Sequence, residues 1–200
     1  NKFSKQCGID RNKFIILLPG RLTYWKGQKI FIEALKLLLD QDNVKPFEGI
    51  ILGSDQGRNV YKKQLISLVE KYRLSDIIKF IDYCEEMPVA YSIANMVCSC
   101  SYEPEALGRV SVEAQSMGIP IIASNIGGSM ETIIKDKTGF LFKSGDSNDL
   151  VHAIIMVMNK NYNSLKSIGF AGRKNILNKF DVDKMCHTTF TEYKKLIELS

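Results

Sequence analysis

The chain has 200 residues, of which 45% are hydrophobic and 24% charged, a composition typical of a soluble globular protein. No apolar run approaches the ~20 residues of a membrane-spanning helix, and the first residues lack the apolar core of a signal peptide. The net charge is a modest +5, and the lysines and arginines are dispersed along the chain. This pattern argues against a nucleic-acid partner and is typical of a solvated surface. The alternatives are that the charge serves to bind an anionic membrane surface or an acidic small substrate.

Apolar runs and helical periodicity alternate along most of the chain. In chain order they predict a strand at 14–18, a helix at 28–40, a strand at 49–52, a helix at 60–72, a strand at 77–81 and a short helix at 87–94. A strand at 96–100, a helix at 109–117, a strand at 120–123, a short helix at 129–135 and a brief strand at 139–142 follow. From residue 147 onward only helices are predicted, at 148–158, 165–178 and 181–199.

Strands that alternate with helices at this spacing indicate βαβ units, and hence a doubly wound parallel sheet of the α/β class with helices on both faces. We expect residues 1–200 to form one such domain, whose last part consists of C-terminal helices. The chain enters through a polar stub and has no initiator methionine, so we expect Asn1 to be an internal point of a longer protein. Ligands of such folds bind at the carboxyl ends of the strands, where the turns after the first four strands line one cleft.

The turn after the first strand reads Pro-Gly-Arg-Leu-Thr-Tyr-Trp-Lys-Gly at 19–27. Gly20 permits close approach of a ligand to the backbone, and Arg21 and Lys26 place two cations at the strand end. Paired cations suit a diphosphate, which offers several charged acceptors. The alternative is that Arg21 and Lys26 are exposed surface cations without a ligand.

The segment from Ser101 to Met117 joins the fourth strand to a helix that begins after Gly108. A helix start offers free backbone N–H groups and the positive end of the helix dipole to an anion. Glu105 precedes this helix and Glu113 lies just over one turn inside it, so two carboxylates flank the anion position. In the alternative interpretation, Glu105 only complements the dipole and Glu113 lies at the solvent edge.

Other motifs have simpler explanations. The glycine pair in 125–131 predicts a tight turn with Ser129 as the N-cap of the next helix, and a role in lining the site ranks second. The Asp-Val-Asp triplet at 181–183 resembles a metal site but better fits a helix start. His152 and His187 are isolated and have no accompanying nucleophile. The five cysteines lack metal-ligand spacing, and Cys98 and Cys100 are expected as core residues in a reducing cytosol.

Taken together, these residues resemble the carboxyl-terminal half of a retaining group-one (family 4) glycosyltransferase, the GT-B type with two Rossmann-like domains. The similarity is carried by the segments at 19–27, 52–58, 87–91, 101–114, 117–133 and 137–142. The sequences at 103–110 and 113–118 are similar to those of the family branch that builds bacterial lipopolysaccharide cores and other surface glycans.

The resemblance implies a role for each matching residue. Arg21 and Lys26 would hold the diphosphate of a nucleotide-sugar donor and stabilise it as a leaving group, while Gly20 would let the loop approach the phosphates. Glu105 would contact the hydroxyls of the sugar, and Glu113 those of the ribose. The backbone at Leu107, Gly108, Arg109 and Val110 would also bind the phosphates, and the stretch 81–86, with Tyr83 and Cys84, would border the base. Leu107 departs from the more frequent phenylalanine, which puts the identity of the sugar in doubt.

The resemblance also implies transfer of a hexose with retention, with no obligatory metal or other cofactor. It implies an amino-terminal domain that binds a saccharide or lipid-linked acceptor, and to which the helix at 181–199 would cross back. We therefore expect a cytoplasmic enzyme, with the full-length protein peripheral at the inner face of the membrane, and a donor half with little transfer activity alone. The alternatives are a nucleotide-sugar epimerase, a non-catalytic nucleotide-sugar binding module and a dinucleotide-binding oxidoreductase, the last disfavoured because Gly-x-Gly-x-x-Gly is absent.

Overall fold

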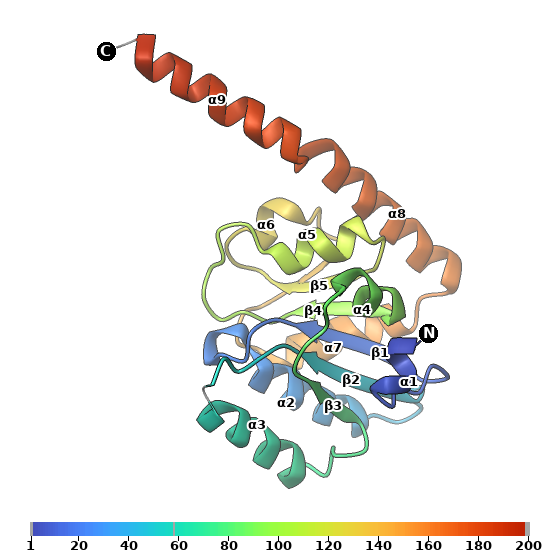
Figure 1. Cartoon of the computed structure of the whole chain (residues 1–200). Helices are drawn as coiled ribbons and strands as arrows, with labels where there is room; N and C mark the ends of the chain where they lie inside the picture. The colour runs from blue at the N-terminus through green and yellow to red at the C-terminus, as the bar shows by residue number, and fades with distance from the viewer. Residues whose placement is uncertain (1, 58, 199–200) are drawn as a thin grey trace.

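A six-stranded, entirely parallel sheet organises the chain, whose computed structural model describes residues 2–57 and 59–198 (Figure 1). The strand order is β3-β2-β1-β4-β5-β6. The strands are β1 (Phe14–Pro19), β2 (Phe47–Leu52), β3 (Ile78–Ile81), β4 (Met96–Ser99), β5 (Ile121–Ser124) and β6 (Phe140–Phe142). The chain builds outward from β1 through β2 to β3, and then from β4 through β5 to β6 on the other side. The predicted doubly wound α/β fold is confirmed, and its topological switch point lies between β1 and β4.

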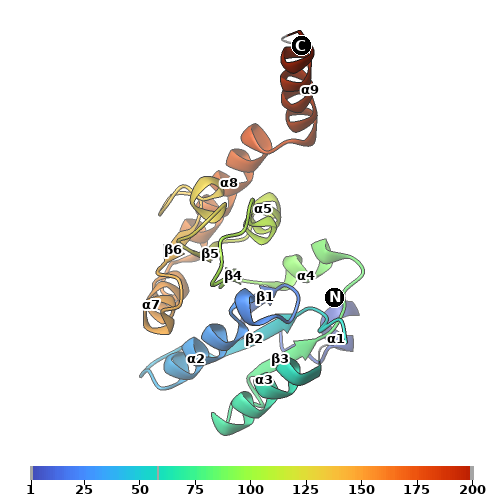
Figure 2. The same ribbon diagram turned by 90° about the vertical axis from the view of Figure 1, so that its left-hand side faces the viewer.

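Helices cover both faces of this sheet (Figure 2). They are α1 (Lys2–Gln6), α2 (Gln28–Leu39), α3 (Asn59–Lys71), α4 (Met87–Ile93), α5 (Arg109–Ser116), α6 (Ser129–Thr132), α7 (Ser147–Met158), α8 (Tyr162–Lys179) and α9 (Val182–Glu198), with a 3-10 turn η1 (Tyr24–Lys26). Except for α1 and η1, their positions agree with the predicted helices to within a few residues at each end, which is the ordinary uncertainty of helix boundaries.

The side chains of β1 show how one strand supplies two cores. Ile16 and Leu18 point into a cluster formed with α2, α3 and α7, whereas Ile15 and Leu17 point into a second cluster formed with α4 and α5. Because successive side chains of a strand face opposite sides, a continuous apolar run is what a strand covered on both faces requires. The sheet is therefore buried between two apolar layers.

Several predicted details are wrong. The polar stub before the first strand contains the helix α1, and Tyr24–Lys26 forms the unpredicted turn η1. Helix α6 ends at Thr132 rather than at 135, and its N-cap is Gly128, so Ser129 does not cap it. Helix α8 begins three residues earlier than predicted because the side chain of Asn161 caps it. Asn1 and Leu199, which the predictions also covered, lie outside the described residues.

Helix α9 continues from α8 away from the sheet (Figures 1 and 2), and none of its described residues is buried. Asp181 and Asp183 stand at its start, as predicted, since the Met185 amide donates to the Asp181 carbonyl and Asp183 lies in the first turn. Crossing of this helix to a further domain remains a prediction. Among residues 2–57 and 59–198, no helix combines the length and apolar character needed to cross a bilayer.

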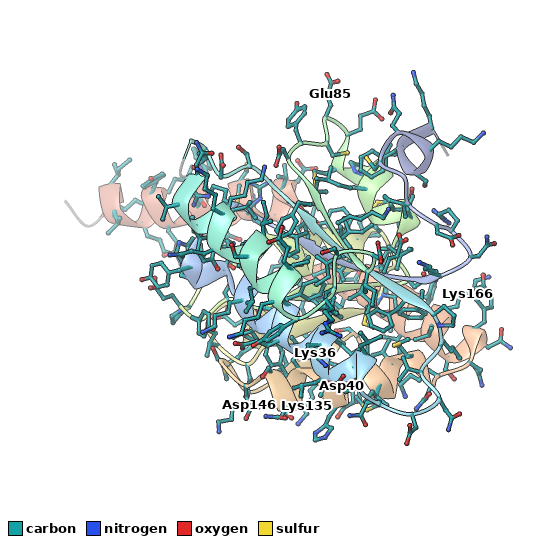
Figure 3. The ribbon with its side chains drawn as sticks, turned by 90° about the horizontal axis from the view of Figure 1, so that it is seen from below. Lys36, Asp40, Glu85, Lys135, Asp146 and Lys166 are labelled. Carbon is teal, nitrogen blue, oxygen red and sulfur yellow. The ribbon has the colours of Figure 1, made fainter. Side chains whose placement is uncertain are left out.

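The positive charges are distributed over separate elements, as the sequence predicts. Lys36 belongs to α2, Lys166 to α8, and Lys135 follows α6; Figure 3 shows Lys166 well apart from the other two. Lys36 is paired with Asp40 one helical turn away. Dispersed lysines with local partners are typical of a solvated exterior.

Candidate functional site

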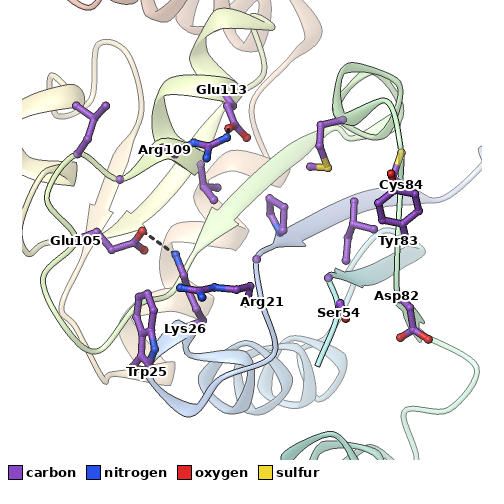
Figure 4. A pocket seen from close by; sticks show the side chains of 18 of the residues that line it. Arg21, Trp25, Lys26, Ser54, Asp82, Tyr83, Cys84, Glu105, Arg109 and Glu113 are labelled. Atoms are coloured by element: carbon purple, nitrogen blue, oxygen red, sulfur yellow. Dashed lines mark hydrogen bonds and ion pairs between the residues drawn. The ribbon is translucent and has the colours of Figure 1, made fainter. Parts of the chain in front are cut away.

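A pocket of about 700 Å³ opens at the carboxyl ends of β1, β2, β3 and β4 (Figure 4). Every residue proposed from the sequence lines it, namely Gly20, Arg21, Lys26, Tyr83, Cys84, Glu105, Leu107, Gly108, Arg109, Val110 and Glu113. These residues come from three separate segments of the chain, after β1, after β3 and after β4. The fold thus brings the predicted site together, while the role of each residue in binding remains a prediction.

Hydrogen bonds tie the loops after β1 and β2 to each other at the floor of the pocket. The Gly20 amide donates to the Leu52 carbonyl at 2.8 Å, and the Leu22 amide donates to the Ser54 carbonyl at 3.0 Å. A Cβ on Gly53 would lie 2.0 Å from the Gly20 carbonyl oxygen, so only glycine fits there. This contact fixes the backbone from which Arg21 projects.

Arg21 is exposed and makes no ion pair within residues 2–57 and 59–198. Its backbone is held from below, because the buried Gln28 side chain donates to the Arg21 carbonyl at 2.8 Å. Gln28 in turn accepts a 3.4 Å hydrogen bond from the Tyr61 hydroxyl. Burial raises the pKa of Tyr61 to about 12, so this hydroxyl stays protonated and able to donate. A rigid loop thus carries a free cation.

Replacement of Gln28 by alanine is expected to lower the free energy of unfolding by about 1–3 kcal/mol, because a buried side chain is lost together with its hydrogen bonds to the Arg21 carbonyl and the Tyr61 hydroxyl. Gln41→Ala is the matched control, since the exposed Gln41 side chain also donates to a backbone carbonyl, at 3.3 Å. Its expected cost is below about 0.5 kcal/mol. Urea unfolding curves measure both values, and equal costs for the two variants would contradict the role assigned to Gln28.

Lys26 faces Glu105 across the pocket wall (Figure 4). Its Nζ lies 2.7 Å from Glu105 Oε2, and the two side chains are only 14% and 18% exposed. The Ser101 hydroxyl donates to the other carboxylate oxygen, Oε1, and the Lys26 ammonium lies 4.5 Å from the centre of the Trp25 ring. The exposed position assumed in the alternative is therefore wrong for Lys26 and right for Arg21, and binding of a ligand by either cation remains a prediction.

The start of α5 forms a second wall of the pocket. Gly108 is the N-cap with a φ of +69°, and the helix begins at Arg109, so the free N–H groups of the first turn border the pocket. A Cβ on Gly108 would lie 3.3 Å from the Ser129 hydroxyl oxygen, which leaves little room for a larger residue. The helix start therefore borders the pocket, as the sequence predicts, and binding of an anion there remains a prediction.

The glycine pair before α6 supports this wall from behind. The Gly128 amide donates to the Glu105 carbonyl at 2.7 Å, and a Cβ on Gly128 would lie 2.5 Å from the Leu107 carbonyl carbon. A Cβ on Gly127 would lie 2.6 Å from the Glu105 carbonyl oxygen. Neither glycine lines the pocket. Their function is to let two backbones pack closely, so that the segment carrying Glu105 and Leu107 is fixed.

Glu113 binds two donors from different helices. The Tyr91 hydroxyl of α4 donates to Glu113 Oε2 at 2.7 Å, and Arg109 Nη2 donates to Oε1 at 3.0 Å. Burial, reinforced by the negative charge of Glu113, raises the pKa of Tyr91 well above its usual value. Glu113 is 33% exposed, in agreement with the alternative of a residue at the solvent edge, but both of its carboxylate oxygens accept hydrogen bonds.

The third wall is the segment after β3. Asp82, Tyr83 and Cys84 all line the pocket, and the Tyr83 ring is exposed. Asp82 is ion-paired with Lys62 of α3, and Cys84 Sγ donates to the Glu86 carbonyl at 3.3 Å. This wall therefore presents the exposed ring of Tyr83 on a segment that is held by the Lys62–Asp82 ion pair and by the hydrogen bond of Cys84. It lies on the side of the pocket away from Glu105 (Figure 4).

Some lining residues were not predicted. They are Pro19, Trp25, Leu52, Gly53, Ser54, Met87 and Ala106. Most of them are next in sequence to a predicted site residue or in the Gly-Ser turn after β2, so the rule that strand ends line the cleft would have found them. No signal in the sequence indicates that Tyr91 donates a hydrogen bond to Glu113, because a tyrosine on the apolar face of a helix is usually interpreted as a core residue.

The arrangement suits a ligand with two adjacent anionic groups. Arg21, Lys26 and the first turn of α5 line one pocket, in which the Glu105 carboxylate lies beside Lys26 and the Glu113 carboxylate beside Arg109 (Figure 4). Cations and backbone N–H groups bind phosphates, and carboxylates accept hydrogen bonds from hydroxyl groups. Within the described part of the chain, no three His, Cys, Asp or Glu side chains gather as a metal site.

Comparison with known proteins gives a consistent result. The family model described as "Glycosyl transferases group 1" matches residues 1–175. The chain is 28% identical over 146 residues to a D-inositol 3-phosphate glycosyltransferase of Corynebacterium diphtheriae, covering 72% of this chain and 34% of that protein. It is 29% identical over 178 residues to the capsular polysaccharide biosynthesis glycosyltransferase CapM of Staphylococcus aureus, covering 84% of this chain and 43% of that protein.

Two solved structures share the fold. A glycosyltransferase from Rickettsia africae superposes with a TM-score of 0.92 at 29% identity, covering 100% of this chain and 52% of that one. Anabaena HepE in complex with UDP-glucose superposes with a TM-score of 0.86 at 28% identity, covering 97% and 52%. The chain therefore spans about half the length of these structures, and between 34% and 43% of the two relatives above.

Proposed function

Because the chain belongs to the glycosyl transferases group 1 family, we propose that it is the donor-binding half of a retaining hexosyltransferase that uses a nucleoside diphosphate sugar. The observation that carries this proposal is that Arg21, Lys26 and the start of α5 line one pocket together with Glu105 and Glu113. The diphosphate would lie between the cations and the helix, the sugar beside Glu105, and the ribose beside Glu113. HepE, which shares the fold, was solved with UDP-glucose, which supports this choice of ligand.

The chemical requirement is to stabilise a departing diphosphate while positive charge develops on the sugar. Donors that are already in place when charge develops contribute most to such a step. Lys26 is held by Glu105 and Trp25, so its ammonium group is ordered before the ligand binds. For Arg21 the backbone is held by Gln28, while the side chain is exposed. In this proposal no protein nucleophile and no metal is required, and the side chains act by positioning and charge.

We extend the proposal to the whole protein. A further, amino-terminal domain would bind a saccharide or lipid-linked acceptor, α9 would cross back to it, and the present chain alone would have little transfer activity. The product would belong to a cell-surface glycan such as lipopolysaccharide, and the enzyme would act in the cytoplasm at the inner face of the membrane. The similarity to CapM, named for capsular polysaccharide biosynthesis, supports a surface glycan without distinguishing lipopolysaccharide from other products.

A thermal-shift panel of uridine, guanosine and adenosine diphosphate sugars tests the ligand class. The diphosphate sugars of one of these three nucleosides are expected to raise the unfolding temperature, because a ligand at 100 times its Kd stabilises the folded state by about 2.7 kcal/mol. For a chain of this length that corresponds to roughly 5–11 °C. The free sugars serve as controls and are expected to cause no shift. Absence of a shift with every nucleotide sugar would contradict the proposed function.

A further inference from the structure

The two oxygens of the Glu113 carboxylate are held in unequal ways. Tyr91 is 1% exposed, and its hydroxyl donates to Oε2 at 2.7 Å from the interior of the domain. Arg109 donates to Oε1 at 3.0 Å, but its side chain is 85% exposed. An exposed ion pair is weak and easily exchanged for another partner, whereas a buried hydrogen bond to a charged group is costly to lose. Oε2 is therefore held in place by Tyr91, and Oε1 is available to accept a hydrogen bond from a ligand.

The anchor is rigid because Tyr91 has little freedom to move. Its ring packs in the cluster that joins α4 and α5 to the sheet, together with Ala90, Val110 and Ala114. A buried tyrosine needs a partner for its hydroxyl, and within the described residues that partner is Glu113. The contact also links α4 to α5, so the carboxylate is fixed relative to both helices rather than to its own alone.

A fixed carboxylate with one available oxygen suits recognition of hydroxyl groups. Each carboxylate oxygen has two lone pairs, so Oε2 can accept a second hydrogen bond while it keeps that of Tyr91, and Oε1 can accept one when Arg109 swings away. Two neighbouring hydroxyls can then donate to one carboxylate, provided that its plane does not rotate. Without the Tyr91 hydroxyl, the side chain of Glu113 would have to be ordered by the ligand itself.

We propose that Tyr91 is a positioning residue that orients Glu113 toward the vicinal hydroxyls of the nucleotide's ribose, and so makes the site selective for ribonucleotides over 2′-deoxyribonucleotides. This inference rests on the proposed function, which assigns the ribose to Glu113. It adds a second residue, on a different helix, and a preference that the family assignment alone does not provide. Other tyrosines of the chain contact neither Glu113 nor Arg109 through a hydrogen bond of the described residues.

The test is a calorimetric comparison of UDP with 2′-deoxy-UDP on the 200-residue chain and its Tyr91→Phe variant. Wild type is expected to prefer UDP by about tenfold, the value of one hydrogen bond to a charged group. Tyr91→Phe keeps the ring and removes the hydroxyl, so it should weaken UDP binding about five- to tenfold and deoxy-UDP binding less than twofold. The preference would then fall from about tenfold to about fourfold or less.

Two controls separate positioning from general damage. Tyr72→Phe removes a hydroxyl from a half-buried tyrosine that does not line the pocket, and should leave the preference unchanged. Glu113→Gln should remove the preference by itself, and adding Tyr91→Phe should then have no further effect on it, as expected for residues that act through one contact.

The outcomes distinguish this inference from the function on which it rests. If wild type binds UDP but Tyr91→Phe weakens UDP and deoxy-UDP equally, Tyr91 is only structural and the inference fails while the donor site stands. An unchanged preference in Tyr91→Phe overturns it as well. If wild type binds no nucleoside diphosphate, the proposed function fails and the inference fails with it.

Discussion

Replacing both Arg21 and Lys26 by alanine is expected to lower the affinity for a nucleoside diphosphate sugar by at least about 100-fold. Each cation would donate charged hydrogen bonds to the diphosphate, worth about 1.5–3 kcal/mol apiece, and every 1.4 kcal/mol is a factor of ten. Both side chains line the pocket, Lys26 from a partly buried position and Arg21 from a loop whose backbone is held by Gln28. Isothermal titration calorimetry with UDP-glucose measures the loss.

A matched control removes the same charges elsewhere. Arg11 and Lys71 are both exposed and lie at the opposite end of the sheet, before β1 and at the end of α3. Arg11→Ala combined with Lys71→Ala should change the affinity less than about twofold, since exposed charges at that distance are largely screened. Thermal unfolding of both double variants checks that the fold survives. Unchanged affinity in the pocket variant would remove the basis for the assigned diphosphate position.

Replacing Gly27 by alanine is expected to cost about 3 kcal/mol or more of folding free energy and to displace Lys26. Gly27 has a φ of +73°, and a Cβ there would lie 1.8 Å from the Cys100 carbonyl oxygen. That contact is with backbone, which cannot turn aside as a flexible side chain can. The same loop is joined to the segment after β4, because the Tyr102 amide donates to the Trp25 carbonyl at 2.7 Å. Relief of the clash must therefore separate η1 from Glu105.

Gly118 provides the comparison for this variant. Its φ of +69° is nearly the same, but the nearest atom to an added Cβ would be 3.8 Å away, an ordinary contact. Gly118→Ala should therefore cost only the backbone strain, about 1–2 kcal/mol. Urea unfolding gives both values, and UDP binding by Gly27→Ala should fall with its stability. Equal costs for the two variants would show that the close approach to Cys100 does not constrain the loop.

The sheet and the position of the pocket could be predicted because simple rules govern them. Continuous apolar runs such as Ile15–Leu18 can be satisfied only by burial on both faces, and strands alternating with helices imply parallel pairing. Parallel strands then place the turn of Arg21 and the turn of Glu105 at one edge. Local spacing cannot rank the strands across the sheet, so the order β3-β2-β1-β4-β5-β6 comes only from the structure.

The supporting contacts could not be predicted for a different reason. Tyr91 and Glu113, or Gly128 and Glu105, meet only because two helices and two loops pack in one particular way. Their sequence signals, a tyrosine on a buried helix face and a glycine pair in a turn, are fully explained by local structure. Ser129 shows the same limit, because capping was assigned from residue type alone, whereas the turn places Gly128 at the N-cap.

A crystal structure of the chain with a bound nucleoside diphosphate sugar tests the central claim most directly. The diphosphate is predicted to lie within hydrogen-bond distance of Arg21, Lys26 and the N–H groups at the start of α5, with the sugar beside Glu105 and the ribose beside Glu113. A nucleotide bound elsewhere on the chain, or bound in this pocket with its phosphates away from both cations, would contradict the account.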